Sequence, residues 1–268
     1  MKNTIIILAA VIACLCSCSE ENGAPSFNFE VMPQIVADNN AAEYNYSRAL
    51  FLRDSVKAVI TYSEDWHDIA EVRKGEKKVT GGPGVTSARF KNGQRVSYKD
   101  GEEALDKHLE KYVFPAMCFV TREMRDEEII AACDFVYNLG IELFCQHHAD
   151  GTFADKGCQS MFYQGLCKGD SPKQLARYIT GFRACPEGSR NGIMSRRWLE
   201  GAIITKNISA KQLSRIPLGS LNGIDWRKKF TKAKPDSDGF YTPDFKQAQK
   251  WVKRYTKRTA SNIYDLGW

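Results

Sequence analysis

The fold of this chain is decided by residues 63–86, which read SEDWHDIAEVRKGEKKVTGGPGVT. The stretch begins at the end of an amphipathic helix, continues through short strand-like segments and closes in a glycine-rich loop. A single acidic side chain, Glu64, stands where the helix ends. What this carboxylate does, and whether a second one works with it, is the question that the rest of the sequence must answer.

The helix that leads into this stretch is expected over residues 46–64. Leu52, Val56 and Ile60 recur every four residues, which predicts one buried apolar stripe. Glu64 follows Ile60 by four residues and therefore lies on the same stripe. A carboxylate on the buried side of a helix is unusual, because charged side chains are mostly exposed. This position makes Glu64 a candidate functional residue.

A hairpin is expected after the helix, within residues 70–84. Val72 and Val79 flank the segment KGEK, which predicts a turn at Gly75. Thr80 then begins a loop that is rich in glycine. The helix therefore leads directly into a small antiparallel sheet.

The composition is that of a globular protein. The chain has 268 residues, 43% hydrophobic and 26% charged, which suits one medium domain with extensions or two small domains. The net charge of +6 is too small to argue for a nucleic-acid partner, and no nucleic-acid motif is found. We expect no nucleic-acid partner, and we expect a monomer.

The N-terminus has the pattern of a bacterial export signal. Lys2 precedes a short apolar run over residues 4–13, which is too short to span a bilayer and has the length of a signal peptide. The run leads to Cys18 in a context that resembles a lipobox, in which the cysteine becomes the lipidated first residue. We expect a lipid anchor at Cys18 and a place in the bacterial cell envelope, periplasmic or on the outer-membrane surface. An ordinary cleaved signal is the alternative.

Six cysteines follow this signal. An exported chain meets an oxidising compartment, so their even number predicts disulfides, although the sequence does not choose among 15 pairings. No pair has the CxxC spacing of a zinc ribbon. His147 and His148 lie near Cys145 and Asp150, but a polar loop is the better reading, and we expect no metal and no cofactor. The six are Cys118, Cys133, Cys145, Cys158, Cys167 and Cys185.

The remaining sequence predicts mainly helices, so the fold class is α+β with its hairpin region near the N-terminus. Asn92-Gly93 is a further turn signal, and Pro and Gly break the chain repeatedly after residue 210. Helices are expected over residues 101–112, 121–140 (Thr121 as cap, Gly140 as stop), 159–168, from Ser171-Pro172 onward, 191–205 and 244–258.

Three motifs, in this order, resemble the phage-type lysozymes, glycoside hydrolase family 24. Residues 80–86, TGGPGVT, match that family's T-I-G-x-G-x-T-like segment. Residues 135–140, FVYNLG, are similar to its F-x-Y-N-x-G helix end, and residues 192–200, GIMSRRWLE, to its closing helix. The resemblance covers residues 46–206, the expected lysozyme-like domain. Before it we expect a lipoprotein-type signal (1–18) and a linker (19–45), and after it a C-terminal extension of unknown role (207–268).

The resemblance implies a muramidase that cleaves the β-1,4 bond between N-acetylmuramic acid and N-acetylglucosamine in peptidoglycan. Glu64 would be the general acid that protonates the leaving oxygen, a role that requires a desolvated carboxyl group. Thr80 would position the attacking water or the sugar. Tyr137 and Asn138 would line the substrate site as a structural helix end, which is a better reading than a catalytic role.

The family's second carboxylate is missing from its usual place. The family has Asp nine residues after the Glu, where this chain has Arg73, and a count back from Thr80 gives Lys74. Glu71 and Glu76 are nearby substitutes, and each is also consistent with a solvated hairpin charge. Glu71 would have to bridge about 6–7 Å along the strand.

Charged residues of the later helices offer further partners. Asp134, on the helix that carries Tyr137, is a more remote carboxylate. Arg196, Arg197 and Glu200 are expected to form ion pairs that hold the closing helix in place.

Two other functions remain open. A catalytically impaired lysozyme homologue that binds peptidoglycan or another glycan would tolerate a basic residue in the Asp position. A lytic transglycosylase would need only the acid Glu64, because the sugar's own hydroxyl replaces water.

Overall fold

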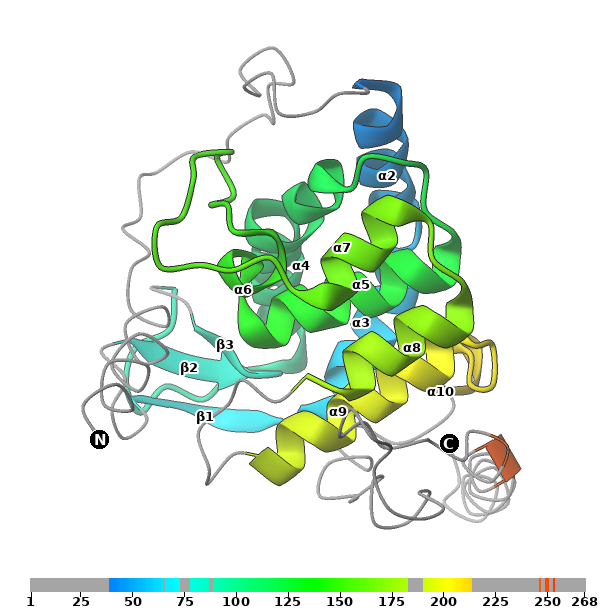
Figure 1. The fold of residues 1–268 in the computed structure, drawn as a ribbon. Coiled ribbons are helices and arrows are strands. Elements are labelled where there is room, and N and C mark those ends of the chain that lie inside the picture. The colour runs from blue at the N-terminus through cyan, green and yellow to red at the C-terminus, as the bar shows by residue number, and fades with distance from the viewer. Residues whose placement is uncertain are drawn as a thin grey trace, which may run out of the picture.

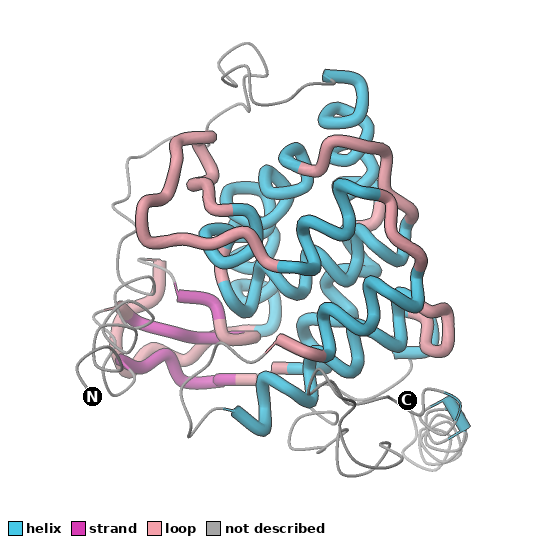
Figure 2. Tube along the Cα trace, in the orientation of Figure 1, coloured by secondary structure: helices cyan, strands magenta, loops and turns pink. Residues whose placement is uncertain are grey.

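The computed structural model describes residues 39–64, 66–72, 78–86, 89–182, 190–213, 246, 249–250 and 253. A small antiparallel sheet lies beside a larger helical lobe, so the fold is α+β as expected (Figures 1 and 2). The helices are α2 (Asn39–Phe51), α3 (Arg53–Ser63), α4 (Tyr98–His108), the π-helix η2 (Leu109–Val113), the 3-10 helix η3 (Phe114–Phe119), α5 (Asp126–Leu139), α6 (Ile141–Cys145), α7 (Met161–Lys168), α8 (Pro172–Thr180), α9 (Arg190–Ile204) and α10 (Ala210–Leu213). The strands are β1 (His67–Val72), β2 (Val79–Gly82) and β3 (Val85–Thr86).

The sheet has the strand order β1-β2-β3 with both pairs antiparallel. The pairing of β1 with β2 confirms the predicted hairpin, whose turn at Gly75 lies outside the described residues. Glu71 lies four positions after His67, whereas their partners Thr80 and Gly82 lie two positions apart. Strand β1 therefore contains two extra residues, and this irregularity sets which side chains face each other.

The segment that follows β3 packs against the sheet and pairs with its edge. Ala70 and Val85 are buried there with Phe90 and Val96. The Val96 amide donates to the carbonyl of residue 68 at 2.8 Å, so this segment runs along the free edge of β1. Gly93 has a φ of +80°, which confirms the predicted Asn-Gly turn.

The helix before the sheet is longer than expected and is interrupted. It begins at Asn39, inside the segment expected to be a linker, and changes direction at Leu52 between α2 and α3. Ala41 and Ala42 are buried, and Asn45 is fully buried with its amide donating to the carbonyls of Val120 and Arg122. Two alanines and an asparagine make no apolar stripe in the sequence, which is why this packing was not predicted.

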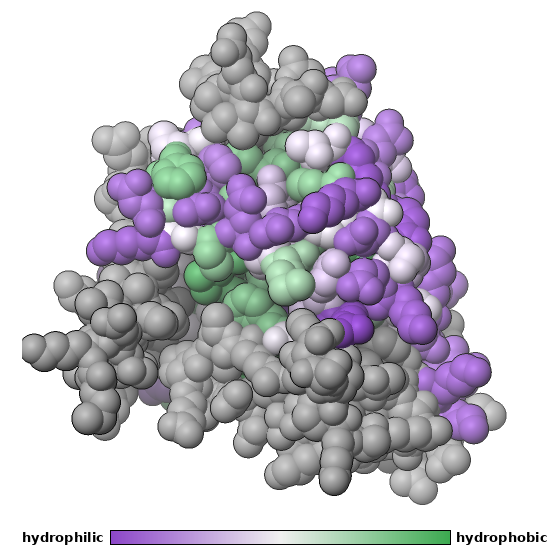
Figure 3. All heavy atoms as spheres, viewed as in Figure 1, coloured by the Kyte–Doolittle hydropathy of each residue, from purple (hydrophilic) through white to green (hydrophobic). Residues whose placement is uncertain are grey.

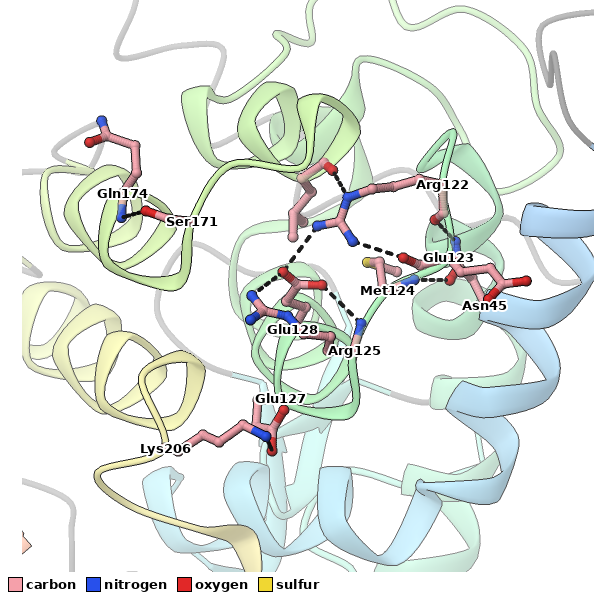
Figure 4. Close-up of polar contacts among 11 residues, drawn as sticks. Asn45, Arg122, Glu123, Met124, Arg125, Glu127, Glu128, Ser171, Gln174 and Lys206 are labelled. Carbon is pink, nitrogen blue, oxygen red and sulfur yellow. Dashed lines mark hydrogen bonds and ion pairs between the residues drawn. The ribbon is translucent and has the colours of Figure 1, made fainter.

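Helix α5 is the central element of the helical lobe and packs against α2, α3, α6 and α9 (Figure 1). It begins at Asp126 and not near Thr121, so the predicted cap is wrong. The buried carboxylate of Glu128 accepts instead from the Arg125 backbone (2.9 Å) and from the side chains of Arg122 (3.0 Å) and Arg125 (2.5 Å) (Figure 4). Burial would raise the pKa of Glu128, but these hydrogen bonds outweigh burial and lower it.

Other helix ends follow local sequence signals. Helix α5 stops at Gly140 and α7 at Gly169, both with positive φ, as predicted. Ser171 caps α8 by accepting from the Gln174 amide at 3.3 Å (Figure 4). Most of the helix expected over 244–258 lies outside the described residues.

The predicted disulfides are not found among the described cysteines. Cys118, Cys133, Cys145, Cys158 and Cys167 are all free thiols. The first three are fully buried and pack as small apolar side chains. Cys185 and Cys18 lie outside the described residues.

The surface of the described part is ordinary. None of its helices is long and apolar enough to cross a bilayer. Hydrophilic residues cover much of the described surface in the view of Figure 3, with an apolar patch near its centre.

Candidate active site

Glu64 ends helix α3 and connects it to the sheet. Its amide donates to the Ile60 carbonyl at 2.9 Å, and its extended backbone leads the chain into β1. The side chain is 22% exposed. A Cβ placed on Gly84 would lie 3.3 Å from Glu64 Oε2, so the carboxylate sits against the turn between β2 and β3. Helix end and glycine-rich loop, which are separate in the sequence, therefore form one site.

Arg196 of helix α9 joins Glu64 to a second, buried acid. Its Nη1 donates to the Glu64 carboxylate. Its Nε and Nη2 donate to the two oxygens of Asp134 on α5, at 2.9 and 2.6 Å. Asp134 is completely buried and Arg196 nearly so. The guanidinium is thus held between two carboxylates of different exposure.

Tyr137 connects helix α5 to the turn beside Glu64. Its hydroxyl donates to the Pro83 carbonyl at 2.9 Å, and the Arg196 guanidinium lies over its ring at 5.6 Å. The ring of His108 packs edge-on against it at 5.3 Å. Tyr137 therefore belongs to the site, and these contacts show it as a support of the turn.

Asn138 is the next residue along α5 and is half-buried. Its Oδ1 has no hydrogen-bond partner within the described part of the chain. Its predicted role in binding substrate stays a prediction.

Thr80 lies in a row of side chains that crosses all three strands. It pairs with Glu71 on β1 and with Thr86 on β3, and the two threonine hydroxyls are 3.1 Å apart. Side chains of directly paired antiparallel residues share one face, with Cβ atoms about 4.5–5.5 Å apart. Thr80 is buried whereas Glu71 is exposed. The regular register of the hairpin on its turn side thus places Glu71 beside Thr80.

The other sequence-predicted charges have different outcomes. Glu76, Arg73 and Lys74 lie outside the described residues. The expected ion pair between Arg197 and Glu200 within α9 is confirmed, and both side chains are fully buried.

The expected ion pairs of Arg196 are also found. Arg196 binds Asp134 on α5 and Glu64 at the end of α3, and these contacts tie α9 to its neighbours. The motif that contains Arg196 was visible in the sequence. Its partners depend on how three helices pack, which the sequence does not show.

The charges of this network reinforce one another. Burial opposes ionisation of Asp134, but the charge and hydrogen bonds of Arg196 outweigh burial and lower the pKa of Asp134. Burial also opposes the charge of Arg196, yet Asp134 and Glu64 raise its pKa well above the usual value. Burial raises the pKa of Glu200 well above its ordinary range. Arg196 and Asp134 therefore each favour the charged form of the other.

The described residues contain no group of three or more side chains arranged to hold a metal ion. His147 Nδ1 is 2.9 Å from the Cys145 carbonyl, and its ring stacks on Phe119 at 4.8 Å. These contacts are those of a packed loop. Trp198 is buried in the core, and Trp66 stacks on Tyr98 at a centroid distance of 5.3 Å.

Comparison with known sequences identifies a family. The model of the family described as "Phage lysozyme" matches residues 67–200, which is half of the 268-residue chain. Comparison with curated proteins gives no match.

Three solved structures are similar to this chain. The muramidase domain of SpmX from Asticaccaulis excentricus is 20% identical, with a TM-score of 0.45, and the match covers 57% of this chain and 95% of that one. An endolysin from Escherichia coli O157:H7 phage FAHEc1 is 21% identical, with a TM-score of 0.46 and coverages of 59% and 94%. The active form of the P1 phage endolysin Lyz is 17% identical, with a TM-score of 0.44 and coverages of 67% and 94%.

Proposed function

The chain belongs to the phage lysozyme family, and on that premise we propose that it is a peptidoglycan hydrolase. The specific reaction is hydrolysis of the β-1,4 bond between N-acetylmuramic acid and N-acetylglucosamine. The observation that carries the proposal is the position of Glu64. Its partly exposed carboxylate ends a helix and lies against the glycine-rich turn of the sheet.

Glu64 is the proposed general acid. Glycoside hydrolysis needs a carboxyl group that protonates the leaving oxygen. The side chain is largely shielded by the turn and by Arg196, yet 22% of it remains open to a substrate. This combination of shielding and access suits an acid that acts on a bound sugar.

Glu71 is the proposed second carboxylate. Its pairing with Thr80 puts a carboxylate next to this threonine. By the family resemblance, Thr80 positions the attacking water or the sugar. Because Glu71 is exposed, its side chain has the freedom to turn toward a bound glycan. In this proposal Thr80 positions the water and Glu71 replaces the acid that is absent at positions 73 and 74.

The proposal is tested with Glu64→Gln and Glu71→Gln in the purified full chain. Asp68→Asn is the matched control, because Asp68 is an exposed acid on the same strand. The assay is the clearing of a peptidoglycan suspension, with mass spectrometry of the products. Loss of one general acid–base group costs about 10²–10⁴-fold, so Glu64→Gln should be inactive in this assay.

Glu71→Gln should lose most of the activity, and Asp68→Asn should keep it. The proposal of hydrolase activity would be refuted by an inert wild-type protein, or by a Glu64→Gln variant that is as active as wild type.

The same assay recognises the two alternatives. A non-catalytic glycan binder would sediment with peptidoglycan and release no fragments. A lytic transglycosylase would release fragments with 1,6-anhydro ends, and Glu71→Gln would be as active as wild type.

We further propose that the protein is lipid-anchored at Cys18 in the envelope of a bacterium, with peptidoglycan as its partner. The support is the sequence alone: Lys2, the short apolar run and the cysteine that follows it. Metabolic labelling with a fatty-acid analogue should mark the wild-type chain and not Cys18→Ser. Equal labelling of both would rule out this anchor.

A further inference from the structure

The contact between Glu64 and Arg196 creates a difficulty for the proposed acid. A guanidinium beside a carboxylate favours its ionised form, typically by about 1–3 pH units. A general acid must instead keep its proton near the working pH. Arg196 donates directly to Glu64, so an arginine with an uncompensated charge would oppose the chemistry.

Asp134 lies on the far side of the same guanidinium. It is completely buried, and both of its oxygens accept from Arg196, at 2.9 and 2.6 Å. This two-bond geometry fixes the plane of the guanidinium. Arg196 therefore reaches Glu64 with Nη1 alone, and with a full negative charge directly behind it.

Stability alone does not account for this buried pair. Burying two ions is costly, and apolar side chains of similar volume often serve a core equally well. Unlike the buried Arg197–Glu200 pair, this pair also contacts Glu64, and that contact connects it to the site. We propose that Asp134 is a positioning residue, whose carboxylate orients Arg196 and offsets its charge beside Glu64. This inference rests on the proposed role of Glu64 and deepens it.

Other titratable groups surround the site on the elements packed near Glu64. Arg197 and Glu200 pair with each other inside α9, Glu200 also shares a hydrogen bond with Asp134, and Tyr137 donates to a backbone carbonyl. Among the described residues, Arg196 is the charged side chain that forms an ion pair with Glu64. Further titratable groups on neighbouring elements include His108 on α4, His67, Asp68 and Glu71 on β1, Lys57 on α3 and Lys211 on α10.

The test compares Asp134→Asn with Asp126→Asn. Asp126 is the matched control, because it also lies on α5 and also accepts two hydrogen bonds from one arginine, Arg48, at 2.7 and 2.8 Å. The readout is a carbon-13 NMR titration of the Glu64 carboxyl group, accompanied by the pH profile of glycan cleavage.

Asp134→Asn should move the Glu64 titration midpoint down by about one pH unit, and the alkaline limb of activity should move with it. Asp126→Asn should move neither. An unchanged midpoint in a folded Asp134→Asn variant would overturn the inference.

A second variant covers the case in which Asp134→Asn does not fold. Asp134→Asn with Arg196→Gln replaces the ion pair by two neutral amides of similar shape. If Asp134 offsets Arg196, the Glu64 midpoint of this double variant stays within about half a pH unit of wild type. A rise of about one unit or more would show that the Arg196 charge acts uncompensated, and would refute the proposal.

The titration does not require catalysis. An inactive wild-type protein would therefore refute the proposed hydrolase activity, and the titration would still test the role of Asp134.

Discussion

The substitution Gly84→Ala tests whether the turn between β2 and β3 holds the Glu64 carboxylate in place. Gly84 has a φ of +85°, and an added Cβ would lie 3.3 Å from Glu64 Oε2 and 3.8 Å from the Tyr137 hydroxyl. A residue with a side chain costs about 1–2 kcal/mol in this backbone region. In addition, the Glu64 carboxylate would have to move by a few tenths of an ångström.

Gly93→Ala is the matched control. Gly93 has nearly the same φ, +80°, but an added Cβ would meet nothing within 4 Å. Both variants should therefore lose about 1–2 kcal/mol of stability. At about 2–4 °C per kcal/mol for a domain of this size, each melting temperature should fall by about 2–8 °C.

Activity separates the two variants. Displacement of a catalytic group by a fraction of an ångström should cost about tenfold or more in the cleavage of peptidoglycan, so Gly84→Ala should be impaired. Gly93→Ala should match wild type when measured well below its melting temperature. Equal activities of the two variants, whether both high or both low, would refute the reasoning that Glu64 acts from its position against Gly84.

Three further predictions concern burial and charge. The lowered pKa of Glu128 means that its stabilisation is present at neutral pH and is lost as the pH falls below its unfolded value of about 4.3. Melting temperatures of Glu128→Gln should thus depend less on pH between 5 and 3 than those of wild type, and an equal dependence in the two proteins would contradict this. A thiol reagent should label exposed Cys158 in the native protein but not Cys118, because burial shields Cys118 and raises its pKa to about 12. Peptide mapping that finds equal labelling of the two cysteines would show that Cys118 is not buried. Arg197→Met should destabilise the protein in denaturant titrations by removing the ion-pair partner of buried Glu200, which then keeps its hydrogen bond to Asp134. Adding Glu200→Leu should recover part of the loss, because apolar side chains often replace a buried ion pair without cost; no recovery would argue against the ion pair.

Local signals in the sequence predicted local structure well. Gly140 and Gly169 end helices because glycine adopts positive φ without strain, and Ser171 caps a helix because its hydroxyl accepts from a free amide. Each effect involves residues within about one helical turn of each other. The placement of Glu64 on the buried face of a helix end follows from the same short-range periodicity.

Predictions failed where packing outweighed local pattern. Residues 39–45 are helical because Ala41, Ala42 and Asn45 find a buried surface, and not because they form a stripe. Helix α5 begins at Asp126 because Glu128 is held by two arginines that both precede the helix, Arg122 and the N-cap Arg125. The cysteines were expected to pair from their number, but the described ones are free, with three of them buried in the core.

By itself the sequence determined the α+β class, the order of helix, hairpin and glycine-rich loop, and the candidate acid Glu64, because these depend on residues close together in the chain. Only the tertiary structure decided which side chains surround that acid. The register of β1 on β2 sets Glu71 against Thr80, and the packing of α9 on α5 brings Arg196 between Glu64 and Asp134. Strand register and helix packing follow from the burial of whole faces, and no short stretch of sequence contains that information.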